Sequence, residues 1–518
     1  MTKTRGLSKQ FLLSDTALLC YIALCTLILH WFSNAMGGYG FFRDELYYIA
    51  CTDHPDLGYV DQPPLSIYVL AVSRWLFGDS LFAIRLIPAL AGAAMVVITG
   101  FTARAMGGGR PAQLMAALAM ACAPINLGFD NYFSMNSLDI LFWTWGAYVV
   151  VRLVNTEDPR YWLLLGCVLG AGLLNKISVL WFGSGLAAGF LLTSHRHWFK
   201  TRWPWYALGI SVVLFLPYVV WNMMHDFAHL EFIRNAVASK YSSLTAAEFI
   251  KGQALLENPI ALPLWLAGAG FFFFTARGKP YRLLGIAYVV AFLILMVNGH
   301  SKAEYLAAAY GFMFAGGGIM VEPLFVPGIK RRLMQVYAVV LVATAIVLAP
   351  FALPIVPVES YIRYAGALGL APSSSEAKKL DRLPQSYADM FGWEEKAAAV
   401  ARAYHALSPE EQKVCAVFAD NYGRCGAIDF FGKNFGLPKS IGKHNSYWIW
   451  GPRNYTGEVM IILGGALKDK QDMFGSVEVA ETVSNTYCMP YENNLNVYVC
   501  RKLKVPLKEL WPRMKQYS

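Results

Sequence analysis

The chain has 518 residues, of which 56% are hydrophobic and only 15% are charged. Soluble domains usually carry about 25% charged residues, and this chain has repeated apolar runs long enough to cross ~30 Å of hydrocarbon. The composition therefore excludes a soluble enzyme and indicates a polytopic α-helical membrane protein. The net charge of +10 requires no nucleic-acid partner, because the basic residues gather in short loops between the apolar runs.

Eleven apolar segments are predicted to cross the membrane. The first is longer than the apolar part of a signal peptide and has no small-residue cleavage site, so we expect it to be retained. The eleven predicted spans lie near residues 16–35, 84–104, 111–127, 137–154, 161–174, 178–193, 204–221, 259–275, 282–298, 305–321 and 334–352.

Basic residues mark alternate loops, which is the positive-inside pattern of membrane proteins. With the N-terminus in the cytoplasm, the inner side receives Lys3, Arg5 and Lys9 and the basic loops at 104–110, 152–160, 196–202, 277–282 and 330–332. An odd number of spans then places the tail on the outer side.

Charged residues on the outer side are candidates for function, because burying a charge near lipid is costly. Asp44 and Glu45 lie in the outer loop 37–80, within YGFFRDELYYIA, and Asp61 precedes Gln62, Pro63 and Pro64 in the same loop. The other outer candidates are Asp139 near the start of the fourth span, Lys176 between the fifth and sixth spans, and Lys302 and Tyr305 at the tenth span.

The tail changes to the pattern of a soluble α/β domain. The segments 414–420, 458–465, SVEVAETV and LNVYVCRKL are typical of strands. We predict a transmembrane module at 1–353 with a catalytic outer loop at 37–80, and an α/β domain at 354–518, which is large enough to bury its own core. Cys488 and Cys500 are symmetric about Asn494, so a hairpin there would place them opposite each other and permit a disulfide.

Four segments resemble a known family. FFRDELYY, DQPPLSIYVLAVSRWLFGDSLFAIRLIPAL, FSMNSLDILFW and GAGLLNKISVLWFG are similar to GT-C type membrane glycosyltransferases that use polyprenyl-phosphate sugars. Within that group they resemble relatives of the protein O-mannosyltransferases and of the aminoarabinose and galacturonic acid transferases that modify lipid A. The tail segments DNYGRCGAIDFFGKNFGLP and HNSYWIWGP look like the outer domain of bacterial members.

The resemblance implies an enzyme of the bacterial inner membrane with a periplasmic tail. It would move a sugar, by an inverting reaction, from a polyprenyl-phosphate donor to an envelope glycolipid, glycan or protein. It places the catalytic aspartate at Asp44, as the base that takes the proton of the sugar acceptor. The alternatives for Asp44 are a solvated loop acid or a helix N-terminal charge, and Glu45 either substitutes for it or orients the loop.

Two lysines are expected to contact the lipid phosphate. Lys176 and Lys302 lie at outer span ends, where an ammonium group reaches a phosphate, although snorkelling to headgroups would explain them equally simply. Asp61 holds the loop or contacts the donor. Tyr305 suits either an aromatic belt or, by the resemblance, the wall of the lipid cavity.

The sequence departs from the family near the fourth span. Family members commonly carry an acid there, and in one register that position falls on Asn136. Asp139 lies one helical turn further on the same face, so we assign the acidic role to it. It would position the sugar acceptor or support Asp44, unless it is only a hydrogen-bonded interfacial acid.

Other functions stay open at this point. A transporter or flippase of lipid-linked sugars would place its polar residues near the membrane midplane, whereas the acids here gather outside. A simple anchor for the tail would leave the outer carboxylates and lysines without a purpose. Metal dependence is also open, because Asp44, Glu45 and Asp139 could hold a divalent cation although the chemistry does not demand one. No other cofactor is expected.

Overall fold

The computed structural model describes residues 14–374, 376 and 378–518, which form two compact units. Unit 1 contains the described chain up to Gly37, together with Phe82–Val219 and Ser243–Pro357. Unit 2 contains Gly38–Leu81, Val220–Ser242 and Val358–Ser518. The basic residues Lys3, Arg5 and Lys9 lie outside the described residues.

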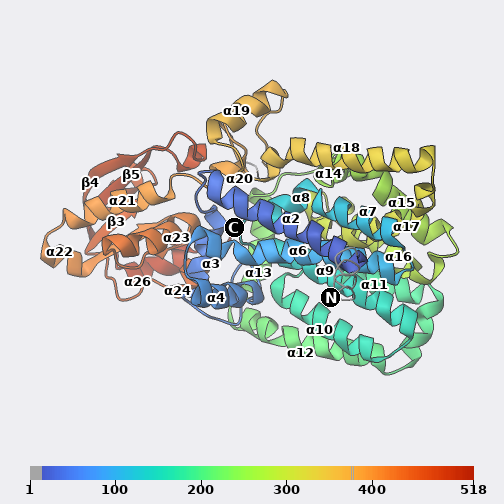
Figure 1. Cartoon of the computed structure of the whole chain (residues 1–518). Coiled ribbons are helices and arrows are strands. Elements are labelled where there is room, and N and C mark those ends of the chain that lie inside the picture. The colour runs from blue at the N-terminus through green and yellow to red at the C-terminus, as the bar shows by residue number, and fades with distance from the viewer. Residues whose placement is uncertain (1–13, 375, 377) are drawn as a thin grey trace, which may run out of the picture. The chain divides into compact units, whose positions relative to one another are not determined.

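Unit 1 is built almost entirely of helices (Figure 1). Its α-helices are α2 (Asp15–Met36), α6 (Leu86–Ala105), α7 (Arg110–Ala121), α8 (Pro124–Phe129), α9 (Met135–Thr156), α10 (Arg160–Asn175), α11 (Val179–Leu191), α12 (Trp203–Met224), α14 (Ala246–Leu256), α15 (Leu262–Phe274), α16 (Arg282–Asn298), α17 (Tyr310–Val321) and α18 (Ile329–Ala352). Short 3-10 helices are η1 (Ser194–Lys200), η2 (Pro259–Ala261), η3 (Lys279–Tyr281), η4 (Ala303–Ala309) and η5 (Glu322–Phe325). The short α5 (Leu81–Ile84) and the end of α12 lie where the chain passes between the units.

Seven helical stretches among the described residues are long and apolar enough to cross a membrane. They are Asp15–Ala35, Leu81–Ala105, Met135–Thr156, Trp203–Met224, Lys279–Asn298, Ala303–Phe325 and Ile329–Ala352. The helices α14 and α15 add an eighth if this pair, bent by 97°, counts as one span. The prediction of a multi-pass helical membrane protein is confirmed.

Each of the eleven predicted spans contains a helix, but several helices are shorter than predicted. The segment 111–127 is the clearest case, because α7 already ends at Ala121 and a new helix begins at Pro124. Proline disfavours the helical conformation of the residue before it, and Ala123 is extended, with ψ at 117°. The helices α7, α10 and α11, with 12, 16 and 13 residues, are each shorter than a single full span.

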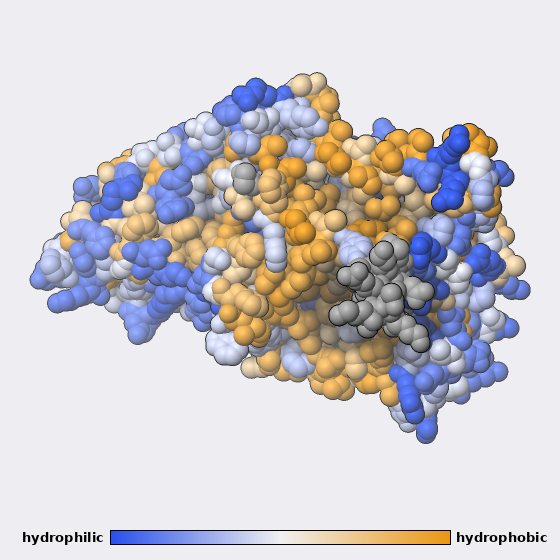
Figure 2. Space-filling view, in the orientation of Figure 1, coloured by the Kyte–Doolittle hydropathy of each residue, from blue (hydrophilic) through white to orange (hydrophobic). Residues whose placement is uncertain are grey.

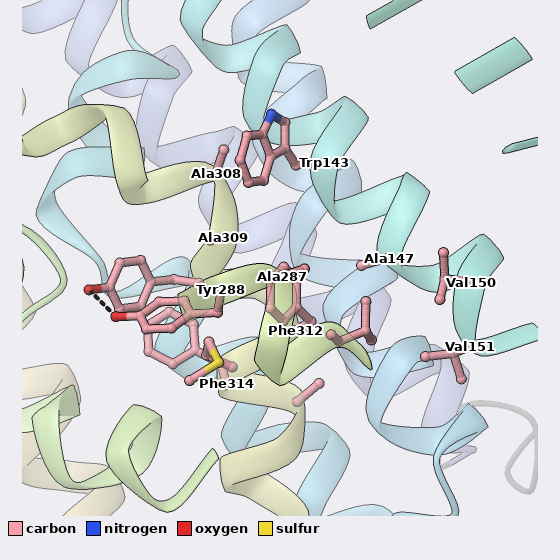
Figure 3. Close-up of a cluster of buried hydrophobic side chains, with 14 of the residues drawn as sticks. Trp143, Ala147, Val150, Val151, Ala287, Tyr288, Ala308, Ala309, Phe312 and Phe314 are labelled. Carbon is pink, nitrogen blue, oxygen red and sulfur yellow. Dashed lines mark hydrogen bonds between the residues drawn. The ribbon is translucent and has the colours of Figure 1, made fainter. Parts of the chain in front are cut away.

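Part of the core of unit 1 lies where α9, α16, η4 and α17 meet (Figure 3). Trp143 of α9 stacks on Phe182 of α11 with ring centroids 4.7 Å apart. The hydroxyls of Tyr288 and Tyr310, 3.2 Å apart, form a hydrogen bond inside this apolar cluster. A Cβ atom at Gly317 would collide with the carbonyl oxygen of Leu264, so the small residues of α17 allow a close approach of α15, as in other membrane bundles.

The surface of the helices fits a membrane environment. Figure 2 shows hydrophobic side chains over α2 and α12, and hydrophilic side chains over α22 (Pro409–Val414) of unit 2. On α12 the side chains of Val213 and Leu208 are more than half exposed. Such apolar exposure is costly in water and is typical of a lipid-facing helix.

Unit 2 contains a five-stranded sheet in the order β2-β1-β3-β5-β4. The strands are β1 (Cys415–Ala419), β2 (Ile441–Gly442), β3 (Val459–Leu463), β4 (Phe474–Val483) and β5 (Leu495–Leu503). Strands β2, β1 and β3 are parallel, whereas β5 and β4 are antiparallel to their neighbours. Every residue of β1 and β3 is buried, as expected for central strands covered on both faces. The predicted α/β domain and its strands are confirmed.

The helices of unit 2 come from three separate parts of the chain. They are α3 (Arg43–Thr52), α4 (Leu65–Phe77), α13 (Ala228–Ser239), α19 (Val358–Ala367), α20 (Gln385–Ala388), α21 (Trp393–His405), α22, α23 (Tyr422–Phe431), α24 (Ser446–Trp450), α25 (Leu467–Met473) and α26 (Leu507–Leu510), with 3-10 helices η6 (Gly432–Phe435), η7 (Pro490–Glu492) and η8 (Trp511–Met514). A Cβ atom at Gly426 of α23 would lie 2.7 Å from the carbonyl oxygen of Leu46 in α3. The outer loop therefore packs directly against the tail.

The predicted Cys488–Cys500 disulfide is wrong. The hairpin is formed by β4 and β5, with Val483 opposite Leu495 and Val477 opposite Cys500. Cys488 lies in the connection between these strands, where its thiol donates to the carbonyl of Asn485. All nine cysteines are free thiols. Cys488 and Cys500 do not face each other because the turn of the β4–β5 hairpin is not centred on Asn494.

Candidate active site

Asp44 lies in the first turn of α3, with one carboxylate oxygen held and the other available. Its Oδ1 accepts hydrogen bonds from the hydroxyl of Tyr422 at 2.9 Å and from Nε of Arg43 at 3.2 Å. Among the described residues no group donates to Oδ2, and the side chain is 33% exposed. The carboxylate is thus oriented by the protein while one oxygen remains open to a substrate.

Glu45 has a different partner from Asp44. Its carboxylate accepts a hydrogen bond from the backbone N–H of Phe42 at 2.8 Å, and the residue is fully buried. This contact satisfies one of the unpaired N–H groups at the start of a helix. The position of Glu45 favours the second of its two predicted roles, that of orienting the loop.

Arg43 is a buried cation surrounded by carboxylates. Besides Asp44, it lies 3.6 Å from Glu376 and 3.4 Å from Asp389, and it donates to the hydroxyl of Tyr491 at 2.9 Å. Burial raises the pKa of Asp389 to about 7, although Arg43 acts in the opposite direction. The guanidinium group therefore lies within ion-pair distance of three acids, and Lys240 brings a second cation to one of them, Glu376.

Tyr422 is supplied by the tail, at the first position of α23. Asn421 caps this helix by accepting from the N–H of Arg424 at 2.9 Å. The ring of Tyr422 packs against Tyr47 and His444, with centroids 4.7 and 4.8 Å apart. Burial raises the pKa of Tyr422, so its hydroxyl stays protonated and donates its hydrogen to Asp44.

Asp61 is linked to the tail through the hydroxyl of Tyr47. Its Oδ1 accepts from the hydroxyl of Tyr47 at 2.9 Å, and that hydroxyl lies 2.8 Å from Oγ of Ser446. Burial raises the pKa of Asp61 to about 6. The neighbouring Gln62 is fully buried, and neither polar atom of its side chain has a hydrogen-bond partner in the described part of the chain.

Three residues around Asp44 were not predicted as site residues: Arg43, Tyr422 and Lys240. Lys240 lies 3.9 Å from Glu376 and 5.9 Å from the centroid of the Tyr422 ring. Arg43 stands next to Asp44 in the family-like FFRDELYY segment, so that segment carried a usable signal. Lys240 follows α13 in a stretch whose sequence has no recognisable motif.

Unit 1 brings Asp139, Lys176 and Tyr305 together. Nζ of Lys176 donates to Oδ1 of Asn136 at 2.8 Å, lies 3.4 Å from Oδ2 of Asp139, and stands 4.7 Å from the centroid of the Tyr305 ring. The other oxygen of Asp139 accepts from the hydroxyl of Ser178 at 2.6 Å. Asn136 and Asp139, one turn apart on α9, thus hold the same ammonium group.

Lys302 precedes Tyr305 at the start of η4. Its ammonium lies 3.9 Å from the carboxylate of Glu304, and 18% of the side chain is exposed. The backbone N–H of Tyr305 donates to the carbonyl of Lys302 at 3.1 Å. This turn sets Lys302 and Tyr305 on one short helical segment.

A metal site was left open by the sequence. No group of three or more His, Cys, Asp or Glu side chains suited to hold a metal ion occurs within residues 14–374, 376 and 378–518. Asp44 and Glu45, two of the three acids considered as ligands, point in different directions.

Comparisons with known proteins place the fold of this chain in a class. Residues 61–221 match the family described as dolichyl-phosphate-mannose-protein mannosyltransferase. The chain is also similar to the crystal structure of ArnT from Cupriavidus metallidurans bound to undecaprenyl phosphate, with a TM-score of 0.61 at 12% identity over 92% of this chain and 97% of that one. The fold is therefore the GT-C fold of ArnT.

Two relatives narrow the resemblance. The undecaprenyl phosphate-alpha-4-amino-4-deoxy-L-arabinose arabinosyl transferase of Pseudomonas paraeruginosa (strain DSM 24068 / PA7) is 24% identical over 302 residues, which are 51% of this chain and 54% of that protein. The lipid A galacturonosyltransferase RgtD of Rhizobium johnstonii is 26% identical over 187 residues, which are 36% of this chain and 39% of that protein. The chain spans about half of the length of the arabinosyl transferase. The resemblance to GT-C glycosyltransferases drawn from the sequence is confirmed.

Proposed function

We propose that this protein is a membrane glycosyltransferase that moves a sugar from a polyprenyl-phosphate donor to an acceptor in the bacterial cell envelope. The observation that carries the proposal is the half-open carboxylate of Asp44, whose Oδ1 is fixed by Tyr422 and Arg43 while Oδ2 is available. The names of the relatives, an arabinosyl transferase and a lipid A galacturonosyltransferase, support a lipid-linked sugar donor and a glycolipid acceptor such as lipid A.

In the proposed reaction Asp44 acts as the general base. Oδ2 of Asp44 takes the proton of the acceptor hydroxyl. At the same time the oxygen of that hydroxyl forms a bond to the anomeric carbon of the sugar. The bond between that carbon and the phosphate oxygen breaks, and the lipid phosphate leaves with an additional negative charge. A positioned base of this kind contributes about 10²–10⁴ in rate.

The positively charged groups of unit 1 would serve the donor. Lys176 contacts the lipid phosphate and stabilises the leaving charge, while Asn136, Asp139 and Tyr305 hold its ammonium group. Asp139 thereby supports Lys176 rather than receiving a proton itself. Lys302 adds a second cation for the phosphate.

The composition of unit 2 supports a specific membrane topology. Residues 38–81, 220–242 and 358–518 pack into one unit, so all three lie on the same side of the membrane. The stretches between them leave that side and return to it, and each must cross the membrane an even number of times. The first stretch contains three long spans, α6, α9 and α12, so an odd number of the shorter helices α7, α10 and α11 must also cross.

An arrangement with eleven crossings satisfies both conditions. It uses α2 and the six helices between residues 81 and 224, which are α6, α7, α9, α10, α11 and α12. Between residues 243 and 357 it uses four spans: α14 with α15 counted as one, α16, α17 with η4, and α18. The basic loops at 104–110, 152–160, 196–202, 277–282 and 330–332 then all fall on the side opposite to unit 2, in accord with the positive-inside rule. The module at 1–353 would lie in the inner membrane, and unit 2, with the domain at 354–518, would lie in the periplasm.

Reporter fusions test this topology. Alkaline phosphatase, which is active only outside the cytoplasm, should be active when fused after Ser518 or within 240–245, and silent when fused within 107–109 or 277–279. Phosphatase activity at 107–109 would contradict the proposed topology.

A transfer assay tests the function itself. Purified full-length protein in nanodiscs would receive undecaprenyl-phosphate aminoarabinose or galacturonic acid, with lipid A, a glycan or an unfolded envelope protein as the acceptor. We expect mass spectrometry to show sugar added to lipid A. Movement of intact donor between leaflets without any transferred sugar would instead indicate a flippase.

A further inference from the structure

The end of α19 and the turn after it form a continuous apolar surface. Every residue in the segment 366–372, with the sequence GALGLAP, is exposed, and none of these side chains is polar or charged. Leu368 and Leu370 are 47% and 49% exposed. A run of consecutive exposed apolar residues is unfavourable in water unless a partner covers it. We call the segment 366–372 the α19 tip.

The α19 tip has a defined conformation. Gly369 adopts a φ of +66°, and the backbone N–H of Leu370 donates to the carbonyl oxygen of Ala365 at 3.0 Å. Together they close the helix in the manner of a Schellman motif. Nearer its start, α19 is held by Tyr361, which is 4% exposed and whose ring centroid lies 5.0 Å from that of Tyr387 in α20. An ordered turn therefore carries the two exposed leucines.

The chain keeps the α19 tip close to the membrane. Five residues separate the end of α18 at Ala352 from the start of α19 at Val358, and an extended chain of that length spans at most about 20 Å. The helix α18 is long and apolar enough to cross a membrane, and a helix of the length of α19 adds only about 15 Å. A lipid surface therefore lies within reach of the tip in every molecule, whether or not another protein is present.

The charges beside the tip suit an anionic surface. Glu359 and Arg382 form an ion pair at 2.9 Å. Among the other exposed residues that the structure describes between positions 358 and 382, three are basic and one is acidic: Arg363, Lys378, Lys379 and Asp381. Basic residues that flank exposed apolar ones are typical of segments that bind anionic lipid headgroups. Charge and hydrophobicity thus favour the same partner, a lipid surface.

The α19 tip is also connected to the start of α3 within unit 2. The carbonyl oxygen of Ser373, directly after the tip, accepts from the backbone N–H of Gln385 in α20 at 3.2 Å. Asp389, which follows α20, accepts through its carbonyl oxygen from the backbone N–H of Arg43 at 3.0 Å. The position of the tip therefore bears on the helix that carries Asp44.

We propose that the α19 tip is a lipid-binding site. Leu368 and Leu370 insert into the headgroup region of the membrane beside α18, and Lys378 and Lys379 contact anionic headgroups there. The docked tip holds α20, and through it the start of α3, at a fixed distance from the membrane surface. This site depends on α18 crossing the membrane and is independent of sugar transfer.

Depth-dependent fluorescence quenching tests the insertion. The full-length protein is first freed of its three exposed cysteines, Cys20, Cys25 and Cys167, by substitution with serine, because the other six are buried. Leu368→Cys then carries an NBD label in nanodiscs whose lipids bear a nitroxide near the headgroup. A segment that enters the membrane by about 5–10 Å lies at that depth, so we expect the label to lose roughly half of its emission. Val479→Cys on β4, at a residue 45% exposed, is the matched control and should keep its emission.

The contribution of the basic residues is measured in the same assay. Quenching at residue 368 should be stronger in nanodiscs with phosphatidylglycerol than in purely zwitterionic ones, because each basic residue near an anionic surface adds about fivefold in affinity. Lys378→Gln with Lys379→Gln should remove most of this difference. Lys468→Gln with Lys508→Gln, at exposed positions elsewhere in unit 2, should keep it.

Three results would contradict the proposal. Equal quenching at residues 368 and 479 would place the tip in water. A label at residue 368 that is shielded from aqueous iodide but not quenched by the nitroxide lipid would show that protein covers the tip. Hydrogen exchange at residues 385–389 should be faster in Leu368→Glu with Leu370→Glu than in the wild type, and unchanged exchange would show that docking does not hold α20. Wild-type melting temperatures verify that the labelled variants are folded.

Discussion

Arg43 in unit 2 is a buried cation and Lys176 in unit 1 a largely buried one, with 12% of its side chain exposed, but their surroundings differ. Lys176 faces one carboxylate, Asp139, and one amide, so the charges cancel. Arg43 faces the three carboxylates of Asp44, Glu376 and Asp389. Several carboxylates close together disfavour one another's ionised form, so the members of the Arg43 cluster compete for protons. The comparison separates a charge-matched pair in unit 1 from an acid-rich cluster in unit 2.

The sharpest test of this division is Asp44→Asn. The amide keeps the size of the side chain but cannot take a proton, so kcat should fall by about 10²–10⁴ while donor affinity stays near the wild-type value. Steady-state transfer kinetics and donor binding give the two quantities. Asp56→Asn, in the same outer loop, is the matched control. Full activity of Asp44→Asn would show that Asp44 is not the base.

The balanced pair of unit 1 is tested by breaking and then replacing it. Asp139→Ala leaves the Lys176 ammonium buried without an anion, which typically costs about 3–5 kcal/mol of stability. The double variant Asp139→Leu with Lys176→Met replaces both charges by apolar groups and should recover most of the melting temperature, yet bind polyprenyl phosphate more weakly than wild type. Thermal unfolding and lipid binding distinguish the roles. Wild-type lipid affinity in the double variant would make the pair purely structural.

Tyr422→Phe tests the contribution of the tail to Asp44. It removes only the hydroxyl that donates to Oδ1, a hydrogen bond to a charged group worth about 1.5–3 kcal/mol, so we expect kcat to fall about tenfold or more with little change in the donor KM. Tyr404→Phe, whose hydroxyl donates to the carbonyl of Gln412, is the control and should be neutral. A change confined to melting temperature would reduce Tyr422 to a packing role.

The smallest expected effect is the pH dependence of unit 2. The pKa values of Asp389 and Asp61 are raised by burial to about 7 and about 6, above their usual value near 3.9. The folded state therefore binds these protons more tightly, and the associated stability is complete below about pH 4 and is lost as the pH rises through 6 to 7. Melting temperatures between pH 5 and 8 should fall less steeply in Asp389→Asn than in wild type. Asp381→Asn, at an exposed position, should follow the wild-type curve.

Much of the fold could be predicted from the sequence because apolar run length and strand alternation are local signals. All eleven apolar segments contain helices, and β1 and β3 lie at the predicted apolar strands, and β4 and β5 lie where the alternation places them. The failures also have local causes. Pro124 interrupts the third predicted span. The disulfide prediction assumed a turn centred on Asn494, whereas the register of β4 and β5 places the turn before that residue.

The site was less accessible to sequence reasoning. Asp44, Lys176 and Asp139 could be chosen from family-like motifs and from charges at predicted span ends. The contact between Tyr422 and Asp44 joins residues 378 positions apart, and no periodicity reports such a distance. The different partners of Asp44 and Glu45 likewise depend on the helix start at Arg43, since Glu45 caps α3 and Asp44 does not.

The assembly of unit 2 from the beginning and the end of the chain has a consequence for biosynthesis. At about 5–20 residues per second, a ribosome needs roughly 20–75 s after making Asp44 to produce Tyr422. During that interval the α3 loop has already been translated but lacks the helix against which it packs. The nascent chain therefore lacks the hydrogen bond from Tyr422 to Asp44 until α23 has been made, and a chain terminated before residue 422 would never form it.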